Sequence, residues 1–385
     1  MARIAVIGGG IVGVMSALLA RQRGHDVEPF EREERVWSRA SAANEGKVHL
    51  GPIFAMGDVA THRVMIEGSA AFASVVDQAL GVATDWDAVC SQEFDYLVMP
   101  DSLVSADELG RRYRALNRLL DGYPQMSYLG RPLRQIAAEH AHRDKTTGLA
   151  AFHTSERAVD PLRLRDLALR ALTETAVVVH TRAEVARVDQ SGDKATLLFP
   201  SGDRSEPFDA VVNATWERQH AFVPASERHP LNYRVKVAVR VDASERDRAI
   251  TLVQGPFGDV VRLPDYTYLS WYPTGRIVHE SGWEPTAHAL ASAEQVSSLE
   301  ALATETVKQL TEIGAHVGET RVSEIVGGFI LGHGELDIEN PQSRLHARSE
   351  FGVSRHGVVL TPISFKLTTA PLVAQRVVDL LDGGR

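Results

Sequence analysis

Three glycines near the start of the chain have the spacing that phosphate binding requires. Gly8, Gly10 and Gly13 form a G-x-G-x-x-G motif directly after the apolar run Ile4–Ile7. The run predicts a short buried strand. The glycines then permit a tight turn into a helix, close approach of the backbone to a pyrophosphate, and close packing of the helix on the strand.

An acidic residue completes the pattern. Ile11 and Val12 begin an apolar helix whose free N–H groups and positive dipole end suit phosphates. Glu31 ends the next expected strand, 23 residues after Gly8, close to the ~20 typical of the acid that binds ribose hydroxyls. This order of elements favours dinucleotide binding over a glycine-rich turn in an unrelated domain.

The apolar stretch Ile4–Ala20 could also be a secretion signal. Its glycines lie where the apolar core of a signal would be, only Arg3 precedes it as a basic residue, and a helix and strand follow at once. We therefore interpret the stretch as part of the fold.

Composition narrows the functional classes. The 385 residues suffice for two domains or one interleaved unit, and the net charge of −9 disfavours nucleic acid and anionic membranes as partners. No apolar run reaches the ~18 residues of a membrane span. Cys90 is the single cysteine, so an intrachain disulfide and a cysteine-based zinc site are excluded. We expect a cytoplasmic protein without a metal.

A second motif follows the acid. The segment reads Asn44-x-Gly46-x-Val48-His49-x-Gly51, and its asparagine and glycines predict a turn with special backbone angles. With the first motif, this segment resembles the D-amino-acid-oxidase superfamily of FAD enzymes. It is most similar to the 2-hydroxyglutarate dehydrogenase branch, which carries an Asn-x-Gly-x-Ile-His-x-Gly pattern.

Two later segments extend the resemblance. The expected strand that ends at Ala214 and Thr215 resembles a cofactor-binding segment that usually ends Asn-Ala-x-Gly, but Trp216 stands where the family has glycine. Lys366-Leu367-Thr368-Thr369 resembles the Gly-Lys-x-Thr-Thr loop of the glycerol-3-phosphate dehydrogenase branch, with Phe365 in the glycine's place. That loop would bring a helix N-terminus to the flavin and stabilise negative charge there.

The resemblance implies a fold and a cofactor. We expect an α/β chain, α+β overall, in which a Rossmann-like FAD-binding domain (residues 1–57, 146–225 and 325–385) is interleaved with an antiparallel-sheet substrate domain (58–145 and 226–324). Cofactor contacts are expected from Gly8, Gly10, Ile11, Val12, Gly13, Glu31, Arg32, Ser41, Asn44, Glu45, Gly46, Lys47, Val185, Ala214, Thr215, Lys366, Leu367 and Thr368.

Local patterns predict further elements. Asp160 and Pro161 should cap a helix, and residues 176–180, 184–189 and 195–199 should be strands. Residues 292–313 have the apolar spacing of one helix, with Ser292 and Gln295 as its capping box.

Two residues are the catalytic candidates. His49 should lie near the flavin as a general base, a substrate ligand or a covalent anchor, and the alternative is a packed histidine. Lys366 should favour reaction with oxygen or bind a substrate anion, and the alternative is a solvated lysine. Substrate contacts are expected from His49, Arg262, Tyr268, Tyr272 and Arg276, because arginine and tyrosine suit carboxylate capture.

The resulting hypothesis is an FAD oxidoreductase that removes hydride from a C–H next to an amine or a hydroxyl. Its partners would be a small, carboxylate-bearing substrate and either oxygen or an electron carrier. The His49 motif favours a hydroxy acid, while length and layout favour an amine. A flavin monooxygenase is a weaker alternative, because residues 357–362 lack the expected Asp. A non-catalytic protein with the same fold, as in GDP-dissociation inhibitors, is a third.

Overall fold

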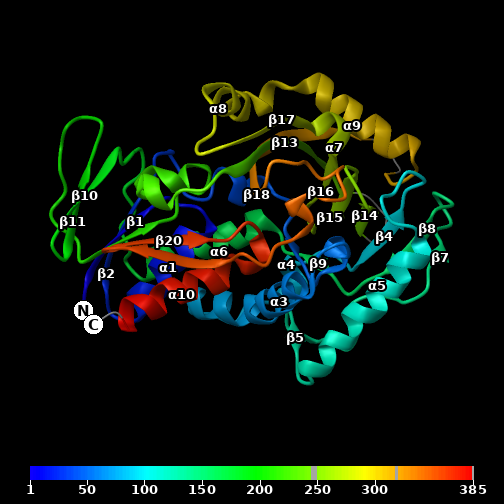
Figure 1. Cartoon of the computed structure of the whole chain (residues 1–385), viewed down its shortest axis with the longest axis horizontal. Coiled ribbons are helices and arrows are strands. Elements are labelled where there is room, and N and C mark those ends of the chain that lie inside the picture. The colour runs from blue at the N-terminus through cyan, green and yellow to red at the C-terminus, as the bar shows by residue number, and fades with distance from the viewer. Residues whose placement is uncertain (244–248, 317–319, 384–385) are drawn as a thin grey trace.

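A computed structural model describes residues 1–243, 249–316 and 320–383 (Figure 1). Its first sheet has the order β19-β20-β12-β1-β2, and its strands from β20 to β2 are parallel. The strands are β1 (Arg3–Ile7), β2 (Asp26–Phe30), β12 (Ala210–Asn213), β19 (Gly352–His356) and β20 (Val359–Ile363). This sheet joins segments from the beginning, middle and end of the sequence.

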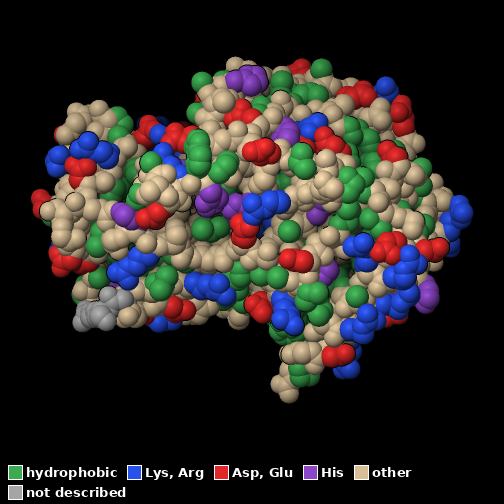
Figure 2. Space-filling view, viewed as in Figure 1, with side chains coloured by type: hydrophobic (Ala, Val, Ile, Leu, Met, Phe, Trp, Pro, Cys, Tyr) green, Lys and Arg blue, Asp and Glu red, His purple; other side chains and the backbone are tan. Residues whose placement is uncertain are grey.

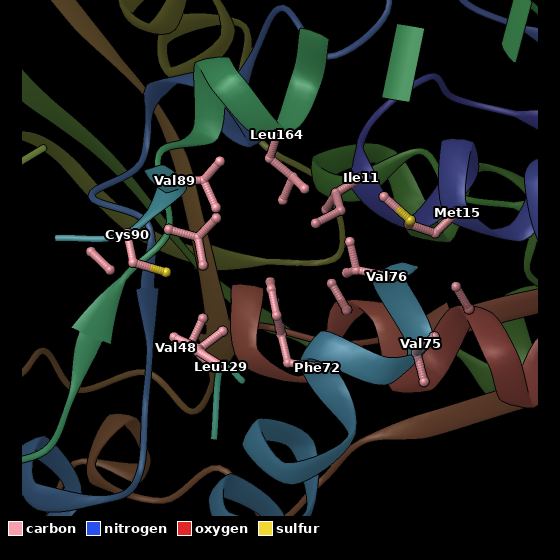
Figure 3. Packing of buried hydrophobic residues seen from close by; sticks show 14 of the residues in the cluster. Ile11, Met15, Val48, Phe72, Val75, Val76, Val89, Cys90, Leu129 and Leu164 are labelled. Carbon is pink, nitrogen blue, oxygen red and sulfur yellow. The ribbon is translucent and has the colours of Figure 1, made fainter. Parts of the chain in front are cut away.

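Helices cover the first sheet. α1 (Ile11–Gln22) follows β1 and packs against α3 (Val59–Leu80) and α10 (Ala370–Gly383), which lie together below the sheet in Figure 1. Ile11 and Met15 of α1 and Phe72, Val75 and Val76 of α3 enter one apolar core (Figure 3). Their burial fixes α1, and with it the glycine motif at its N-terminus.

The second sheet is larger and mostly antiparallel. Its order is β17-β13-β16-β15-β14-β4-β8-β7, with β18 also paired to β13 and a parallel pair between β14 and β4. The strands are β4 (Phe94–Val98), β7 (His142–Arg143), β8 (Ala150–His153), β13 (Leu231–Asp242), β14 (Ala249–Val253), β15 (Gly258–Arg262), β16 (Tyr266–Trp271), β17 (Arg276–Gly282) and β18 (Val322–His333).

The two faces of the central strand β13 differ in character. Tyr233, Val235 and Val237 pack beneath the helices α8 (Ala287–Glu294) and α9 (Glu300–Glu312), which lie along the top of Figure 1. Because side chains alternate along a strand, Arg234 and Lys236 point to the opposite face. That face is turned toward the first sheet, so β13 presents basic side chains to the space between the sheets.

The remaining elements lie outside the two sheets. They are α2 (Ala40–Ala43), β3 (Lys47–Val48), α4 (Trp86–Val89), α5 (Ala106–Leu119), β5 (Ser127–Tyr128), β6 (Arg131–Pro132), β9 (Arg157–Ala158), α6 (Pro161–Glu174), β10 (Arg187–Ser191), β11 (Lys194–Leu198) and α7 (Tyr272–Gly275). Lys and Arg side chains gather over the solvent face of α5 (Figure 2). No helix of the described residues is long and apolar enough to cross a membrane.

The mixed fold class expected from the sequence is confirmed, and several elements lie where the patterns predict. α6 begins at Pro161, and Asp160 accepts hydrogen bonds from the backbone N–H groups of Leu162 (2.9 Å) and Arg163 (3.3 Å). The two strands expected around Gly192 form the β10–β11 hairpin. The expected strand at 176–180 is reduced to one parallel bridge between His180 and Phe30.

The single helix expected at 292–313 is wrong. α8 begins earlier, with the Thr286 hydroxyl as its cap, and a 3-10 turn at Val296–Ser298 separates it from α9. A Cβ on Gly327 of β18 would lie 2.9 Å from Val296, so Val296 packs directly on the strand backbone. This buried contact, together with the Thr286 cap, outweighs local helical periodicity.

The proposed domain division stays a prediction. Residue 146 lies between β7 and β8, and residue 325 lies inside β18, so both boundaries fall within the larger sheet.

Candidate functional site

A long cavity runs between the two sheets, from the end of β2 to the start of α10. The glycine motif and Glu31 line one end, which we call the outer end. Lys47, His49 and Lys366 line the other, the inner end. Its walls include most of the expected cofactor contacts, namely Gly8, Gly10, Ile11, Val12, Glu31, Arg32, Ser41, Asn44, Glu45, Lys47, Val185, Ala214, Thr215, Lys366 and Leu367. Gly13, Gly46 and Thr368 lie just outside the lining.

The glycine motif has the geometry that its sequence predicts. A Cβ on Gly13 would lie 1.9 Å from the carbonyl oxygen of Gly8, so only glycine lets α1 pack this closely on the turn. Gly10 precedes the helix and borders the cavity, and the backbone N–H of Ile11 donates to the Ser41 hydroxyl at 2.9 Å. The N-terminus of α1 therefore faces the cavity beside a hydroxyl group, which suits a phosphate.

Glu31 stands at the outer end of this cavity. Its side chain accepts hydrogen bonds from the backbone N–H groups of Gly9 (2.5 Å) and Glu33 (2.8 Å). These bonds hold the carboxylate at the cavity wall, where its remaining lone pairs can accept from two ribose hydroxyls. The glycine motif, the N-terminus of α1 and the carboxylate of Glu31 together fit the adenosine diphosphate part of a dinucleotide.

Two bulky residues occupy positions where the resembling family has glycine, and they meet in space. Trp216 has a φ of 54°, in the left-handed region that glycine favours, and its indole N–H donates to the carbonyl oxygen of Phe329 at 3.1 Å. The ring of Phe365 lies 6.4 Å from that of Trp216. Both line the cavity, so the chain keeps the glycine-like backbone while adding an aromatic wall.

His49 lies at the inner end of the cavity. Its backbone N–H donates to the Thr368 hydroxyl at 2.7 Å, which ties the β3 segment to the loop before α10. Burial lowers the pKa of His49, although the nearby carboxylate of Glu156 opposes this shift. Its Nδ1 lies 3.6 Å from that carboxylate, and this nitrogen has no hydrogen-bond partner within the described part of the chain.

Glu156 is fully buried beneath His49. It accepts from the backbone N–H groups of Leu50 (2.6 Å) and Gly51 (3.2 Å) and from the hydroxyl of Tyr96. Burial alone would raise the pKa of Glu156, but His49 and Tyr96 outweigh burial and hold the pKa below its usual value. An ionised Glu156 is therefore positioned to stabilise a positive charge on His49.

Two lysines lie on the cavity wall with different surroundings. Lys47 donates to the side chains of Asp259 (2.5 Å) and Thr251 (2.6 Å), so it joins β3 to the second sheet. Lys366 Nζ lies 5.5 Å from the centre of the Phe54 ring. Burial, followed by the positive charge of Arg348, lowers the pKa of Lys366 to about 7. Lys366 can thus gain or lose a proton near neutral pH.

None of the four substrate residues expected besides His49 lines this cavity. Arg262 and Tyr268 are buried in the sheet. The hydroxyl of Tyr272 donates to Asp337 at 2.7 Å, and Arg276 pairs with Asp337 and with Glu339. Arg276 is therefore already engaged by two carboxylates. The role assigned to these residues stays a prediction.

Two buried arginines near the inner end of the cavity, Arg234 and Arg348, are not among the site residues expected from the sequence. The two residues are 3% and 8% exposed. The alternation of basic and apolar residues in 233–241 could have revealed Arg234, because one face of that strand is basic. Arg348 lies in a loop without periodicity, and no local pattern marks it.

The spacing of Asp95, His142 and His153 in the sequence also gives no sign that they meet. In the structure their ligand atoms lie within 4.8 Å of one another. The two imidazole rings stack 4.1 Å apart, and His153 Nδ1 contacts the Asp95 carboxylate at 2.5 Å. The hydrogen bond between Asp95 and His153 and the stacking of the His142 ring bring the three side chains together.

Comparison with known proteins agrees with this geometry. Residues 3–375 match the model of the DAO family, described as FAD dependent oxidoreductase. No curated protein matches the sequence. Glycine oxidase from Geobacillus kaustophilus is a similar structure, with 15% identity, a TM-score of 0.65, and coverage of 100% of this chain and 95% of that chain.

Two further structures have the same fold. Iminodiacetate oxidase from Chelativorans sp. BNC1 has 14% identity and a TM-score of 0.68, over 99% of this chain and 95% of that chain. L-alpha-glycerophosphate oxidase from Mycoplasma pneumoniae, with FAD bound, has 16% identity and a TM-score of 0.61, over the same shares. Since the family match spans nearly the whole chain and the cavity fits its dinucleotide, the chain belongs to the DAO family of FAD-dependent oxidoreductases.

Proposed function

We propose that this chain oxidises a C–H bond next to an amine or hydroxyl group in a small, carboxylate-bearing substrate. The observation that carries the proposal is the pairing of His49 with the buried Glu156 at the inner end of the cofactor cavity. A lowered pKa keeps His49 neutral at physiological pH, so it can accept a proton.

FAD, when bound, would supply the acceptor for the hydride that leaves the substrate carbon. His49 takes the proton from the neighbouring N–H or O–H, so that a C=N or C=O bond forms. Glu156, 3.6 Å from His49 Nδ1, stabilises the resulting imidazolium. Lys366 adds a positive charge at the same end of the cavity when it is protonated, and it helps to hold an anionic group.

The amine and hydroxyl versions of this reaction need the same residues. A neutral histidine accepts a proton from either group, and the similar structures include oxidases named for glycine, for iminodiacetate and for glycerophosphate. We therefore keep both in the proposal, with oxygen or an electron carrier as the final acceptor.

The test is anaerobic titration of purified holoenzyme with amino acids, N-methylamino acids and hydroxy acids. We expect one class to bleach the visible absorption of the cofactor. Oxygen consumption compared with reduction of an artificial dye then separates an oxidase from a dehydrogenase. Absence of bleaching by every class would reject the proposed reaction.

The His49→Asn variant tests the proton acceptor. We expect the fold and FAD content to persist while cofactor reduction slows by ~10²–10⁴, the usual contribution of general base catalysis. His288→Asn on the exposed face of α8 is the matched control and should reduce at the wild-type rate. Cofactor reduction at the wild-type rate in the His49→Asn variant would exclude His49 as the proton acceptor. Cofactor remaining with acid-precipitated wild-type protein would instead indicate a covalent anchor.

A further inference from the structure

Two buried guanidinium groups lie side by side on the cavity face of the second sheet. In the register of β13 and β18, Arg234 is opposite Ile330 and Asn232 is opposite Gly332. Directly opposed residues share a face. The Nη atoms of Arg348 lie 3.4 and 3.5 Å from the position that a Cβ on Gly332 would occupy. The guanidinium group of Arg348 therefore packs over Gly332, and the pair Asn232–Gly332 is the next pair on the same face as Arg234–Ile330. A larger residue at position 332 would displace Arg348.

These two arginines keep unused hydrogen-bond donors although they are buried. Nε and Nη2 of Arg234 and Nε of Arg348 have no partner among the described residues. Arg234 Nη1 donates to the Tyr272 hydroxyl at 3.3 Å, and Arg348 Nη1 donates to the carbonyl oxygen of Ala347 at 2.9 Å. Buried unpaired donors are costly, so donors left open on two neighbouring arginines indicate a ligand that accepts from both.

The charges near these arginines do not balance. Asp337 lies 3.9 Å from Arg234, but its carboxylate already accepts from Tyr272 and pairs with Arg276. Arg348 has no carboxylate partner among the described residues. Burial and the neighbouring Arg234 lower the pKa of Arg348 to about 9. An incoming anion would relieve this repulsion.

The arginine pair is close to the proposed reaction centre. The rings of Phe54 and His49 have centroids 5.4 Å apart, and Arg348 Cζ lies 5.9 Å from the Phe54 centroid. Ile330, directly opposite Arg234, lines the cofactor cavity. A short substrate held by the arginines would thus place its other end beside His49.

We propose that Arg234 and Arg348 form a binding site for a substrate group with two negative charges, either a dicarboxylate or a phosphate or phosphonate. This inference rests on the proposed function, because it places the anionic end of the same substrate. Two guanidinium groups present forked donors that match such oxygens, and a single carboxylate would leave one arginine uncompensated. The substrate is accordingly a small dianion rather than a simple monocarboxylic acid.

The experiment measures anion affinity on holoenzyme through perturbation of the visible spectrum of the cofactor. The probes are succinate, inorganic phosphate and acetate at constant ionic strength and mildly alkaline pH. We expect succinate or phosphate to bind at least about tenfold more tightly than acetate. Preference for succinate would identify a dicarboxylate site, and preference for phosphate would identify a phosphate-type site. Equal affinity for all three anions in the wild-type protein would overturn the proposal.

Variants locate the site. Arg348→Gln and Arg234→Gln should each weaken binding of the preferred dianion by at least about tenfold, and Arg348→Lys should retain part of it because the charge remains. Arg344→Gln is the matched control in the same loop, because that side chain is exposed and pairs with Glu350. Wild-type affinity in both glutamine variants would reject the assignment. Dianion preference without bleaching by any amine or hydroxyl compound would refute the reaction and leave the anion site standing.

Discussion

At the scale of single residues, Glu31 is the side chain that we expect to hold the cofactor most strongly. Its carboxylate is fixed by backbone N–H groups at the cavity wall. Glu31→Ala should weaken FAD binding by roughly 1.5–3 kcal/mol, the range for hydrogen bonds to a charged group. The measurement is the FAD dissociation constant after reconstitution. Glu34→Ala, an exposed neighbouring acid, is the control and should bind FAD normally. Equal affinity in the two variants would contradict this role.

Lys366 should couple folding to pH. Its pKa is lowered from 10.5 to about 7 in the folded chain. Above pH 7 the unfolded chain therefore binds the additional proton, so stability should rise with pH toward 10.5. We expect urea midpoints of FAD-free protein to increase from neutral to alkaline pH, and Lys366→Met to flatten that increase. An unchanged slope in the variant would show that other groups cause it.

Site residues could be predicted from the sequence only where local geometry determines their role. The glycines and Glu31 belong to one strand-turn-helix unit, so their spacing already fixes their positions. Arg276 looked equally suitable for an anion, but Asp337, 61 residues away in sequence, pairs with it. Arg348 reaches the site through a loop whose path depends on tertiary packing. Such long-range pairings leave no trace in local spacing.

At the scale of elements, α6 depends on its buried cap. The Asp160 carboxylate accepts from the backbone of Leu162 and Arg163 and from the Tyr266 hydroxyl at 3.2 Å. Asp160→Ala should cost about 1–2 kcal/mol from the cap alone, and more because Tyr266 loses its acceptor. Urea unfolding provides the measurement.

Asp58→Ala is the matched comparison for Asp160→Ala. Asp58 caps α3 through Thr61 N–H at 2.7 Å but is exposed, so water can replace the lost bond. Asp58→Ala should therefore destabilise the protein less than Asp160→Ala does, and the reverse order would contradict the importance of burial.

Elements were predictable where caps and periodicity agree, and less so where packing decides. α6 has both signals, and it forms where expected. The stretch 292–313 has helical periodicity, yet Val296 packs on Gly327 and interrupts it. The strand expected at 176–180 has apolar residues, but Val178 is 67% exposed and only His180 bridges to β2.

At the scale of the molecule, a buried cluster of charges ties the β3 segment to the second sheet. Asp259 on β15 pairs with Lys47 (2.5 Å) and Lys236 (3.6 Å). Burial alone would raise the pKa of Asp259, but the two lysines outweigh it and hold the pKa below its usual value. Its contribution is therefore present above the ordinary pKa of 3.8 and lost in acid.

Asp259→Asn should destabilise the protein by about 3–5 kcal/mol at neutral pH, because two buried lysines lose their shared counter-ion. Asp265→Asn breaks an exposed pair with Arg163 and should cost at most about 1 kcal/mol. Chemical denaturation of both variants gives the comparison. Similar losses would mean that the buried pair adds nothing beyond a surface pair.

The discontinuous first sheet also has a consequence for the timing of synthesis. β1 leaves the ribosome first, but its neighbour β12 consists of residues 210–213, and β20 follows only at residue 359. β1 therefore stays unpaired on one edge until residues 210–213 are made, and the sheet stays open at β12 until β20 is made, after most of the second sheet. The cofactor can be captured only late in synthesis, because Lys366 and Leu367 complete the cavity wall. A nascent chain interrupted before that point would carry the complete glycine motif and Glu31 without a finished pocket for FAD.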